Sequence, residues 1–85
     1  ERVLKGISGI NHRQLALLSH ALRKPHADYT INSHKVSHRI AYATARSDLL
    51  NLAKMGLLHQ RTVGNAMHFT VGEALLDLLA KTKEI

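Results

Sequence analysis

The first regular pattern of apolar positions lies between residues 11 and 25. Leucines stand three and four positions apart, so that they share one face of a helix: Leu15, Leu18 and Leu22. Asn11, with Gln14 three residues later, matches the capping box that begins a helix, and Pro25 stops the pattern. We therefore predict a helix over residues 12–24.

The middle of the chain predicts two more helices. A short β-favouring run, Tyr29–Ile31, precedes Asn32 and Ser33, which can cap a short helix over residues 33–38. A longer helix is predicted over residues 42–54. Its apolar positions are spaced to lie on one face: Ala45, Leu49, Leu52 and Ala53.

Beyond Gly56, the glycine that ends this helix, the period changes from helical to alternating. Two short β-favouring runs flank Gly64-Asn65 and predict a hairpin over residues 58–71. Gly at the first turn position fits a tight type II′ turn.

A last helix is predicted over residues 73–82, where Thr70 and Glu73 match another capping box. Its sequence "ALLDLLA" holds more leucine than one amphipathic face needs. These leucines either cover the small core as a lid, form a dimer surface, or pack on another domain of the same chain.

The order helix, short strand, helix, turn, helix, hairpin, helix is the layout of a winged helix-turn-helix domain, mainly α with a small β-hairpin. Two strands alone are marginal, so the hairpin must pack on the helices, and Tyr29–Ile31 can add a third strand at its edge. We expect one domain over residues 1–85 with its core at 11–71. The opening "ERVLKG", without an initiator Met, indicates a fragment of a longer protein.

The charge of the chain bears on its partner rather than on its fold. The chain carries 12 Lys and Arg against 6 Asp and Glu, a net charge of +6. Between residues 11 and 70 only Asp28 and Asp48 oppose the basic residues Arg13, Arg23, Lys24, Lys35, Arg39, Arg46, Lys54 and Arg61. A basic centre between neutral ends predicts a polyanionic partner, although surplus Lys and Arg on an ordinary soluble surface is the simpler alternative.

Several classes of protein are disfavoured by what the sequence lacks. With no cysteine, the chain has no disulfide and no thiolate metal site, which favours an intracellular, cytoplasmic protein. No continuous apolar run approaches the length of a membrane span, so no membrane partner is expected. No nucleophile, base and orienting residue fall in a recognisable pattern, so we predict neither an enzyme nor a cofactor.

Two stretches resemble known families. The segment "TARSDLLNLAKMGLL" is similar to the recognition helix and wing start of DeoR-type bacterial repressors, which read T-x-R-x-D-L-x-x-L-x-x-x-G-x-L. More closely, "YTINSH", a following "SH" and "YATARSDLLNL" resemble the winged-helix domain at the C-terminus of many bacterial Fic-family proteins. The match covers residues 11–58 well, the hairpin loosely and the last helix hardly at all.

The Fic resemblance implies an accessory domain rather than a catalyst. Fic proteins are typically AMP transferases that use a His-containing loop with a Gly-Asn pair and arginines. Gly64-Asn65 lacks the upstream His-x-Phe and the downstream Arg of that loop. The resemblance therefore implies a DNA-binding, transcription-regulating module or, alternatively, a protein-interaction module that positions or restrains a Fic AMP-transferase domain in the same parent chain.

Two positions depart from the usual helix-turn-helix pattern. Arg39 stands at the turn between the second and third helices, where glycine is common because a positive φ costs it little. Ala41 stands where Ser or Thr commonly caps the recognition helix, which weakens its start by ~1 kcal/mol.

The solvent face of the helix over residues 42–54 holds the candidate DNA-reading residues: Tyr42, Ala43, Arg46 and Ser47. Arg46 can contact guanine in bidentate fashion or bind a phosphate. Alternatively, Arg46 pairs with Asp48 or Asp28 and only solvates the helix.

Other basic residues flank this helix. Arg61, with His59 and the hairpin tip, is the expected wing contact to phosphate or minor groove. Lys35 and Arg39 lie near the preceding turn, where contacts to the DNA backbone would anchor the domain.

His34 and His38 are four positions apart and share a face of the predicted second helix. A metal site would need a third ligand from His12, His20, His59 or His68. Helix-turn-helix domains normally hold apolar, core-facing residues at these two positions, so we interpret both as partly buried, hydrogen-bonded histidines and predict no metal site. If neutral imidazoles pack there, mildly acidic pH should loosen this helix.

Overall fold

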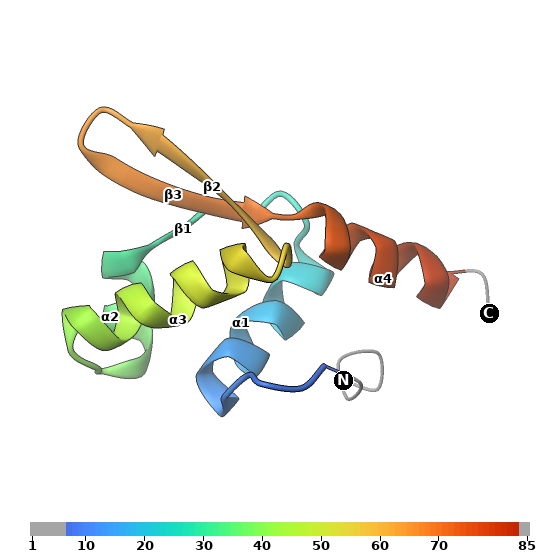
Figure 1. Cartoon of the computed structure of the whole chain (residues 1–85), viewed down its shortest axis with the longest axis horizontal. Helices are drawn as coiled ribbons and strands as arrows, with labels where there is room; N and C mark the ends of the chain where they lie inside the picture. Colours follow the sequence, from blue (N-terminus) through green and yellow to red (C-terminus); the bar gives the residue numbers. More distant parts are fainter. Residues whose placement is uncertain (1–6, 84–85) are drawn as a thin grey trace.

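The computed structural model describes residues 7–83 (Figure 1). Its elements are α1 (His12–Arg23), β1 (Tyr29–Thr30), α2 (Ile31–His38), α3 (Tyr42–Lys54), β2 (Leu58–Val63), β3 (Ala66–Val71) and α4 (Glu73–Lys83). This order confirms the predicted fold class, mainly helical with a small antiparallel sheet. Of the helices between residues 7 and 83, none combines the length and the apolar character that crossing a bilayer requires.

α1 begins as predicted but buries a different face. The Asn11 side chain accepts the Gln14 backbone N–H at 2.9 Å, and the Gln14 side chain accepts the Asn11 N–H at 2.8 Å, which completes the capping box. Of the leucines that the spacing places on one face, Leu18 is fully buried, whereas Leu15 is exposed. The buried residues of α1 are Gln14, Leu17, Leu18 and Ala21.

α2 begins two residues earlier than predicted. Its N-cap is Thr30, whose Oγ1 accepts the Ser33 N–H while Ser33 Oγ accepts the Thr30 N–H, both at 3.0 Å. This reciprocal pair satisfies two donors, whereas a cap at Asn32 or Ser33 would satisfy one. Ile31 consequently belongs to the helix rather than to the predicted strand, and it is buried.

The strands form one antiparallel sheet in the order β1-β3-β2. β1 is the expected third strand at the edge, with Tyr29 opposite Phe69. β2 and β3 pair along their whole length. At the turn Gly64 has a φ of 61° while Asn65 has no positive φ, as the predicted type II′ turn requires.

The core is aliphatic around a single aromatic ring, that of Phe69. Every helix and the sheet contribute to it, because each presents one apolar face to the others. Its buried apolar side chains are Leu17, Leu18, Ala21, Ile31, Ala45, Leu49, Leu52, Leu57, Leu58, Phe69 and Leu75.

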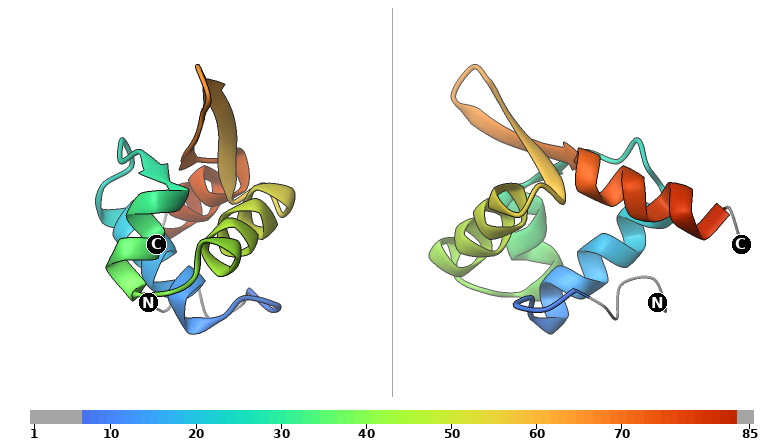
Figure 2. Two further views of the ribbon diagram at one scale, coloured as in Figure 1. Left: turned by 90° about the vertical axis from the view of Figure 1, so that its left-hand side faces the viewer. Right: turned by 45° about the vertical axis from the view of Figure 1, so that its right-hand side comes forward.

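The hairpin of β2 and β3 extends away from the helices in all views (Figures 1 and 2). In β2 only Leu58 is buried, and the five residues after it are exposed. In β3 Phe69 is the buried residue. The base of this hairpin therefore completes the core and its tip lies in solvent. We call residues 58–71 the wing.

The predicted capping box at Thr70 and Glu73 is wrong. Thr70 lies inside β3 and α4 begins at Glu73, so Gly72 takes the cap position. The Gly72 N–H donates to the Leu57 carbonyl at 3.0 Å, and a Cβ on Gly72 would lie 2.4 Å from the Gly56 carbonyl oxygen. Only glycine fits here, because the start of α4 passes directly against the backbone that follows α3.

α4 closes one end of the core. Leu75 is fully buried and Leu78 packs against the core, which agrees with a lid. Leu76 is 46% exposed and leaves apolar surface for a partner. The Leu79 side chain lies outside the part of the chain that the structure describes.

Candidate nucleic-acid interface

α3 has two distinct faces. Its core face carries Ala45, Leu49 and Leu52, all fully buried, as the spacing predicts. The opposite face carries the four candidate reading residues, and all four are exposed: Tyr42, Ala43, Arg46 and Ser47. The helix therefore presents a short polar surface with one large aromatic side chain at its N-terminal end.

The Arg46 guanidinium is free to bind an external group. Among the side chains that the structure describes, it has no ion-pair partner. The alternative, that Arg46 pairs with Asp48 or Asp28, is wrong: Asp48 pairs with Arg13, and Asp28 contacts His68 at 3.0 Å.

Asp48 is the centre of a buried hydrogen-bond network on the core side of α3. Arg13 donates to it twice, from Nε to Oδ2 at 2.8 Å and from Nη2 to Oδ1 at 3.1 Å. Asn11 Nδ2 donates to Oδ1 at 2.9 Å, and His34 Nε2 lies 2.9 Å from Oδ2. Gln14 Nε2 donates to the Asp48 carbonyl at 2.9 Å. One carboxylate thus ties α3 to both α1 and α2.

The network keeps the Asp48 carboxylate ionised. Burial would raise its pKa, but hydrogen bonds from Arg13, Asn11 and His34 outweigh burial and lower the pKa to about 2. Among the described residues, every buried side-chain nitrogen and oxygen has a partner. One of the basic residues counted toward a polyanion, Arg13, is therefore committed to the fold.

One charged position in the sequence points to this network, although it lies among the apolar positions of α3. Asp48 falls three residues after Ala45 and four before Leu52, inside the buried stripe of α3. A charged residue at such a position must be paired when buried. Its partners Asn11 and Arg13 are more than 30 positions away, and sequence spacing alone does not identify them.

The turn between α2 and α3 has the backbone that glycine would favour. Arg39 is left-handed, with φ 53° and ψ 50°, and ends α2 by donating its N–H to the Lys35 carbonyl. Arg39, at a position where glycine is common, therefore has a strained backbone conformation. This conformation costs a residue with a Cβ roughly 1–2 kcal/mol. The Arg39 side chain is exposed and Lys35 is half-buried, both beside the start of α3.

Ala41 is the N-cap of α3, and no side chain caps the helix there. The first backbone N–H groups of α3 are thus left for solvent or a ligand, as the sequence predicts.

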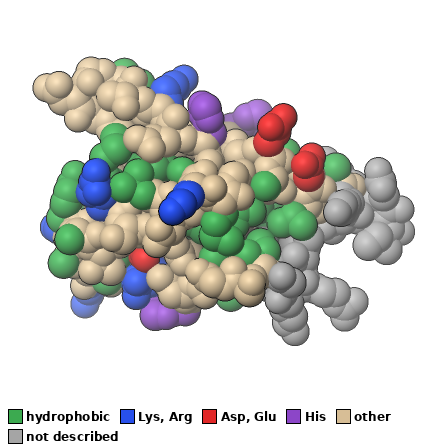
Figure 3. Space-filling model, in the orientation of Figure 1, with side chains coloured by type: hydrophobic (Ala, Val, Ile, Leu, Met, Phe, Trp, Pro, Cys, Tyr) green, Lys and Arg blue, Asp and Glu red, His purple; other side chains and the backbone are tan. Residues whose placement is uncertain are grey.

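The wing brings further positive charge. Arg61 and His59 are exposed on β2, and Arg61 stands opposite His68 of β3. In Figure 3 basic side chains are spread over α3 and the wing, whereas acidic ones stand out over α4. Glu73 and Asp77 are those exposed acidic residues of α4. A third exposed acidic residue, Asp28, lies against the wing, where it pairs with His68.

A shallow groove connects the wing tip to the helix-turn-helix. It is lined by Thr30, Ile31, Asn32, Tyr42, Asn65, Ala66 and Met67. Tyr42 is shared between α3 and this groove, so it lies where helix and wing meet. Asn32 and Asn65 line the same groove and were not among the sequence-predicted contacts.

The two histidines of α2 pack against each other. His34 is buried and bonded to Asp48, and the His38 ring meets it edge-on with centroids 4.7 Å apart. The prediction of buried, hydrogen-bonded imidazoles is confirmed for His34, and His38 is half-buried against it. Within residues 7–83, no three His, Asp or Glu side chains are grouped to hold a metal ion.

The winged helix-turn-helix fold is defined by three helices, of which α2 and α3 form the helix-turn-helix, and by a projecting hairpin. Solved structures share it. The homodimeric winged helix-turn-helix DNA-binding domain of a possible ArsR-family transcriptional regulator from Mycobacterium bovis is 22% identical, with TM-score 0.66, over 86% of this chain and 66% of that one. A MarR family protein from Bacillus stearothermophilus is 16% identical, with TM-score 0.68, over 98% and 57%.

HlyU from Vibrio cholerae is a third neighbour, 13% identical with TM-score 0.66 over 98% of this chain and 83% of that one. No protein-family model and no curated protein matches the sequence. At these identities the likeness shows the fold alone. The chain also spans somewhat less than two thirds of the Mycobacterium domain and of the MarR family protein.

Proposed function

We propose that this chain is a double-stranded DNA-binding domain of a transcription regulator, with α3 in the major groove and the wing on the DNA backbone. The observation that carries the proposal is the exposed Arg46 on the solvent face of α3, which has no ion-pair partner among the described side chains. A surface Arg without a partner beside an exposed Tyr42 is suited to base edges, because guanidinium donors match guanine O6 and N7. In winged-helix neighbours from regulators, the same fold is named as DNA-binding.

Each candidate residue has a role in this proposal. Arg46 reads guanine or binds a phosphate, and Tyr42 packs on a thymine methyl or bonds to the DNA backbone. Ala43 and Ser47 lie close to the groove floor, where small side chains allow α3 to approach. Lys35, Arg39 and Arg61 hold phosphates, which fixes the orientation of the domain without reading sequence.

Alanine variants test these roles by fluorescence anisotropy on a mixed-sequence duplex at low salt. We expect Arg46→Ala and Arg61→Ala each to weaken binding by roughly tenfold, since each removes a contact of ~1–3 kcal/mol. Lys24→Ala is the matched control, because Lys24 is an exposed cation that follows α1. If all three variants bind alike, the assignment of α3 and the wing is wrong.

We also propose that the regulator works as a homodimer in the cytoplasm. The exposed Leu76 of α4 supports this, and the Mycobacterium neighbour is a homodimer. Two-fold symmetry would present two copies of α3 to half-sites about one helical turn apart. A mass from sedimentation that stays monomeric up to high protein concentration, in the wild type and in Leu76→Glu alike, would exclude this arrangement.

The alternative function is a protein-interaction module beside a Fic AMP-transferase domain of the same parent chain. The motif residues that resemble Fic-family winged helices serve the fold here: Thr30 and Ser33 cap α2, and His34 bonds to Asp48. Such residues support a shared fold more than a shared partner. The alternative is favoured if the domain binds no duplex yet associates through Leu76 with a Fic catalytic fragment.

A further inference from the structure

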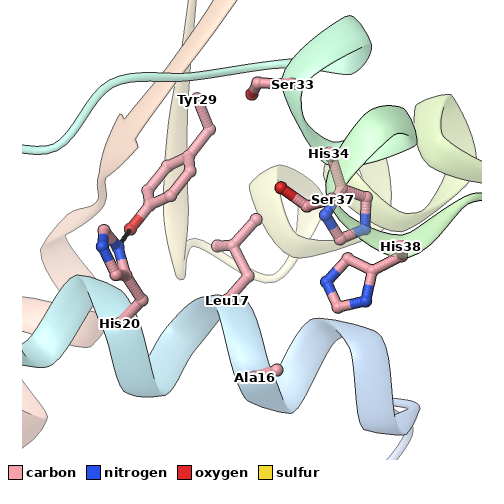
Figure 4. A pocket seen from close by; sticks show the side chains of 8 residues that line it. All are labelled: Ala16, Leu17, His20, Tyr29, Ser33, His34, Ser37 and His38. Atoms are coloured by element: carbon pink, nitrogen blue, oxygen red, sulfur yellow. Dashed lines mark hydrogen bonds between the residues drawn. The ribbon is translucent and has the colours of Figure 1, made fainter.

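A second concave site lies between α1 and α2, lined by Ala16, Leu17, His20, Tyr29, Ser33, His34, Ser37 and His38 (Figure 4). Leu17 forms its floor. The His20–Tyr29 pair stands on one side of Leu17, and Ser37, His34 and His38 stand on the other. Three imidazoles and three hydroxyl groups thus surround one small apolar floor.

Most of these polar groups already have partners. His20 Nδ1 is 2.7 Å from the Tyr29 hydroxyl, Ser33 is engaged in the α2 cap, and His34 bonds to Asp48. The Asp48 carboxylate accepts this hydrogen bond from His34 Nε2. Ser37 and His38 are the two polar residues of the cleft without such a partner among the described side chains. They are consecutive residues in the last turn of α2, and both line the same hollow.

The cleft suits an anion when His38 is protonated, because the nearby cation Arg13 is already paired with Asp48. Among the described residues no carboxylate lines the cleft, and Asp48, which contacts the lining residue His34, is already satisfied by Arg13, Asn11 and His34. His38 is surrounded by cationic or protonatable groups: His12 and Arg13 of α1, and His34 on its own helix; only Asp48 of α3 opposes them. Burial, together with His34 and Arg13, lowers the pKa of His38.

We propose that this cleft binds a small oxyanion through the Ser37 hydroxyl and a protonated His38. An anion there would supply the negative charge that the cleft lacks, and binding would be coupled to uptake of one proton by His38. A metal cation fits less well, because two of the three lining imidazoles are already engaged, His20 with the Tyr29 hydroxyl and His34 with Asp48. The oxyanion is either inorganic, such as sulfate or phosphate, or the carboxylate of a small molecule whose apolar part covers Leu17.

The cleft is connected to α3 through His34. His34 forms one wall of the cleft and bonds with its other edge to Asp48 of α3. Proton uptake at His38, whose ring touches that of His34, therefore alters the charge next to the network that seats α3. An effect of this proton uptake on DNA binding rests on the proposed function, whereas anion binding itself does not.

The test is a sulfate titration followed by NMR of the imidazole and α2 amide signals, at constant ionic strength. Sulfate stays doubly charged from pH 6.5 to 7.5, so any change of affinity comes from the protein. Since only the protonated form of His38 binds, affinity should be roughly tenfold stronger at pH 6.5 than at pH 7.5. Acetate, titrated in the same way, distinguishes an inorganic oxyanion from a carboxylate.

Matched variants separate this site from others. Ser37→Ala suits a helix interior, and we expect it to weaken binding roughly fivefold by removing one hydrogen bond. His38→Gln should abolish the pH dependence, whereas His26→Gln, at an exposed position outside the cleft, should change nothing. Arg46→Ala should also leave binding intact, so failure of the DNA proposal does not affect this result.

Three outcomes would overturn the proposal. The first is that neither sulfate nor acetate shifts the Ser37 and His38 signals. The second is that the shifts persist in Ser37→Ala and His38→Gln but vanish in Arg46→Ala, which would assign the anion to α3. The third is that Zn²⁺ alone, and neither anion, perturbs His34 and His38, which would make the cleft a cation site.

Discussion

At the scale of single residues, one buried charge organises what surrounds the recognition helix. Asp48 lies on the core face of α3 and is held by Arg13, Asn11 and His34. Arg46, two positions earlier, faces solvent with no such partner among the described side chains. Nearly opposite faces of one helix turn thus separate a charge that serves the fold from a charge left for a ligand.

Asp48→Asn should destabilise the domain by about 3 kcal/mol, because it leaves the Arg13 guanidinium without its counter-charge in a partly buried place. Urea unfolding measures the loss. Asp28→Asn is the control, since Asp28 and His68 form an exposed pair that contributes little. Equal stability of the two variants would show that the Asp48 network does not seat α3.

Arg39→Gly should raise the free energy of unfolding by up to about 1 kcal/mol. The left-handed backbone costs a residue with a Cβ roughly 1–2 kcal/mol, and the greater freedom of glycine in the unfolded chain offsets part of the gain. Arg39→Ala keeps the Cβ and should gain nothing. If the glycine variant is no more stable than the alanine variant by thermal unfolding, the turn is not strained.

At the scale of elements, the bounds of helices with strong local sequence signals could be predicted closely. The contacts of these helices with residues far away in the sequence could not. α3 begins and ends at the predicted residues, because its apolar spacing and Gly56 are local features. α2 begins earlier than predicted, since Thr30 and Ser33 form a capping box that competes with the β preference of Ile31. The exposed face of α3 followed from periodicity, whereas the Asp48 network and the groove at Asn32 and Asn65 arise from tertiary contacts.

The packing of α2 on α1 should weaken in mild acid. The pKa of His38 is lowered in the folded domain, so the unfolded chain takes up this proton first as the pH falls. The stability that neutral His38 contributes is therefore present above its ordinary pKa of about 6.5 and is lost as the pH falls through the folded-state value.

Thermal unfolding in chloride buffer from pH 7.5 to 5.5 checks this prediction. The midpoint should fall in the wild type, and it should fall less in His38→Gln than in His26→Gln. A midpoint that stays flat over this range would contradict it.

The junction of β3 and α4 should tolerate no side chain at Gly72. A Cβ would lie 2.4 Å from the Gly56 carbonyl oxygen and 2.9 Å from two backbone carbons, so the backbone must shift. We expect Gly72→Ala to cost about 3 kcal/mol or more, as overpacking against rigid backbone does. Gly64→Ala is exposed and meets no atom, so it should report only the strain of its positive φ. A Gly72 variant as stable as wild type by urea unfolding would refute this contact.

At the scale of the whole molecule, acidic and basic side chains of the described residues are unevenly distributed. The exposed acidic residues Glu73 and Asp77 lie on α4 and Asp28 pairs with His68 of the wing, while α3, the turn before it and the wing carry Arg39, Arg46 and Arg61. The net charge was evident from the sequence. The number of basic side chains left to meet a polyanion was not, because Arg13 pairs with Asp48. A polyanion would therefore meet the domain on the side of α3 and the wing.

The salt dependence of duplex binding tests this account most directly. Released counterions make log affinity fall linearly with log salt, and a footprint of about four phosphates predicts a slope near −3.6. Arg46→Ala or Arg61→Ala should reduce the steepness by about 0.9 if each holds one phosphate, and Lys24→Ala should not. A steep slope in the wild type that these two variants reduce is the predicted result. A slope near zero, or one that only Lys24→Ala changes, would contradict DNA binding by α3 and the wing.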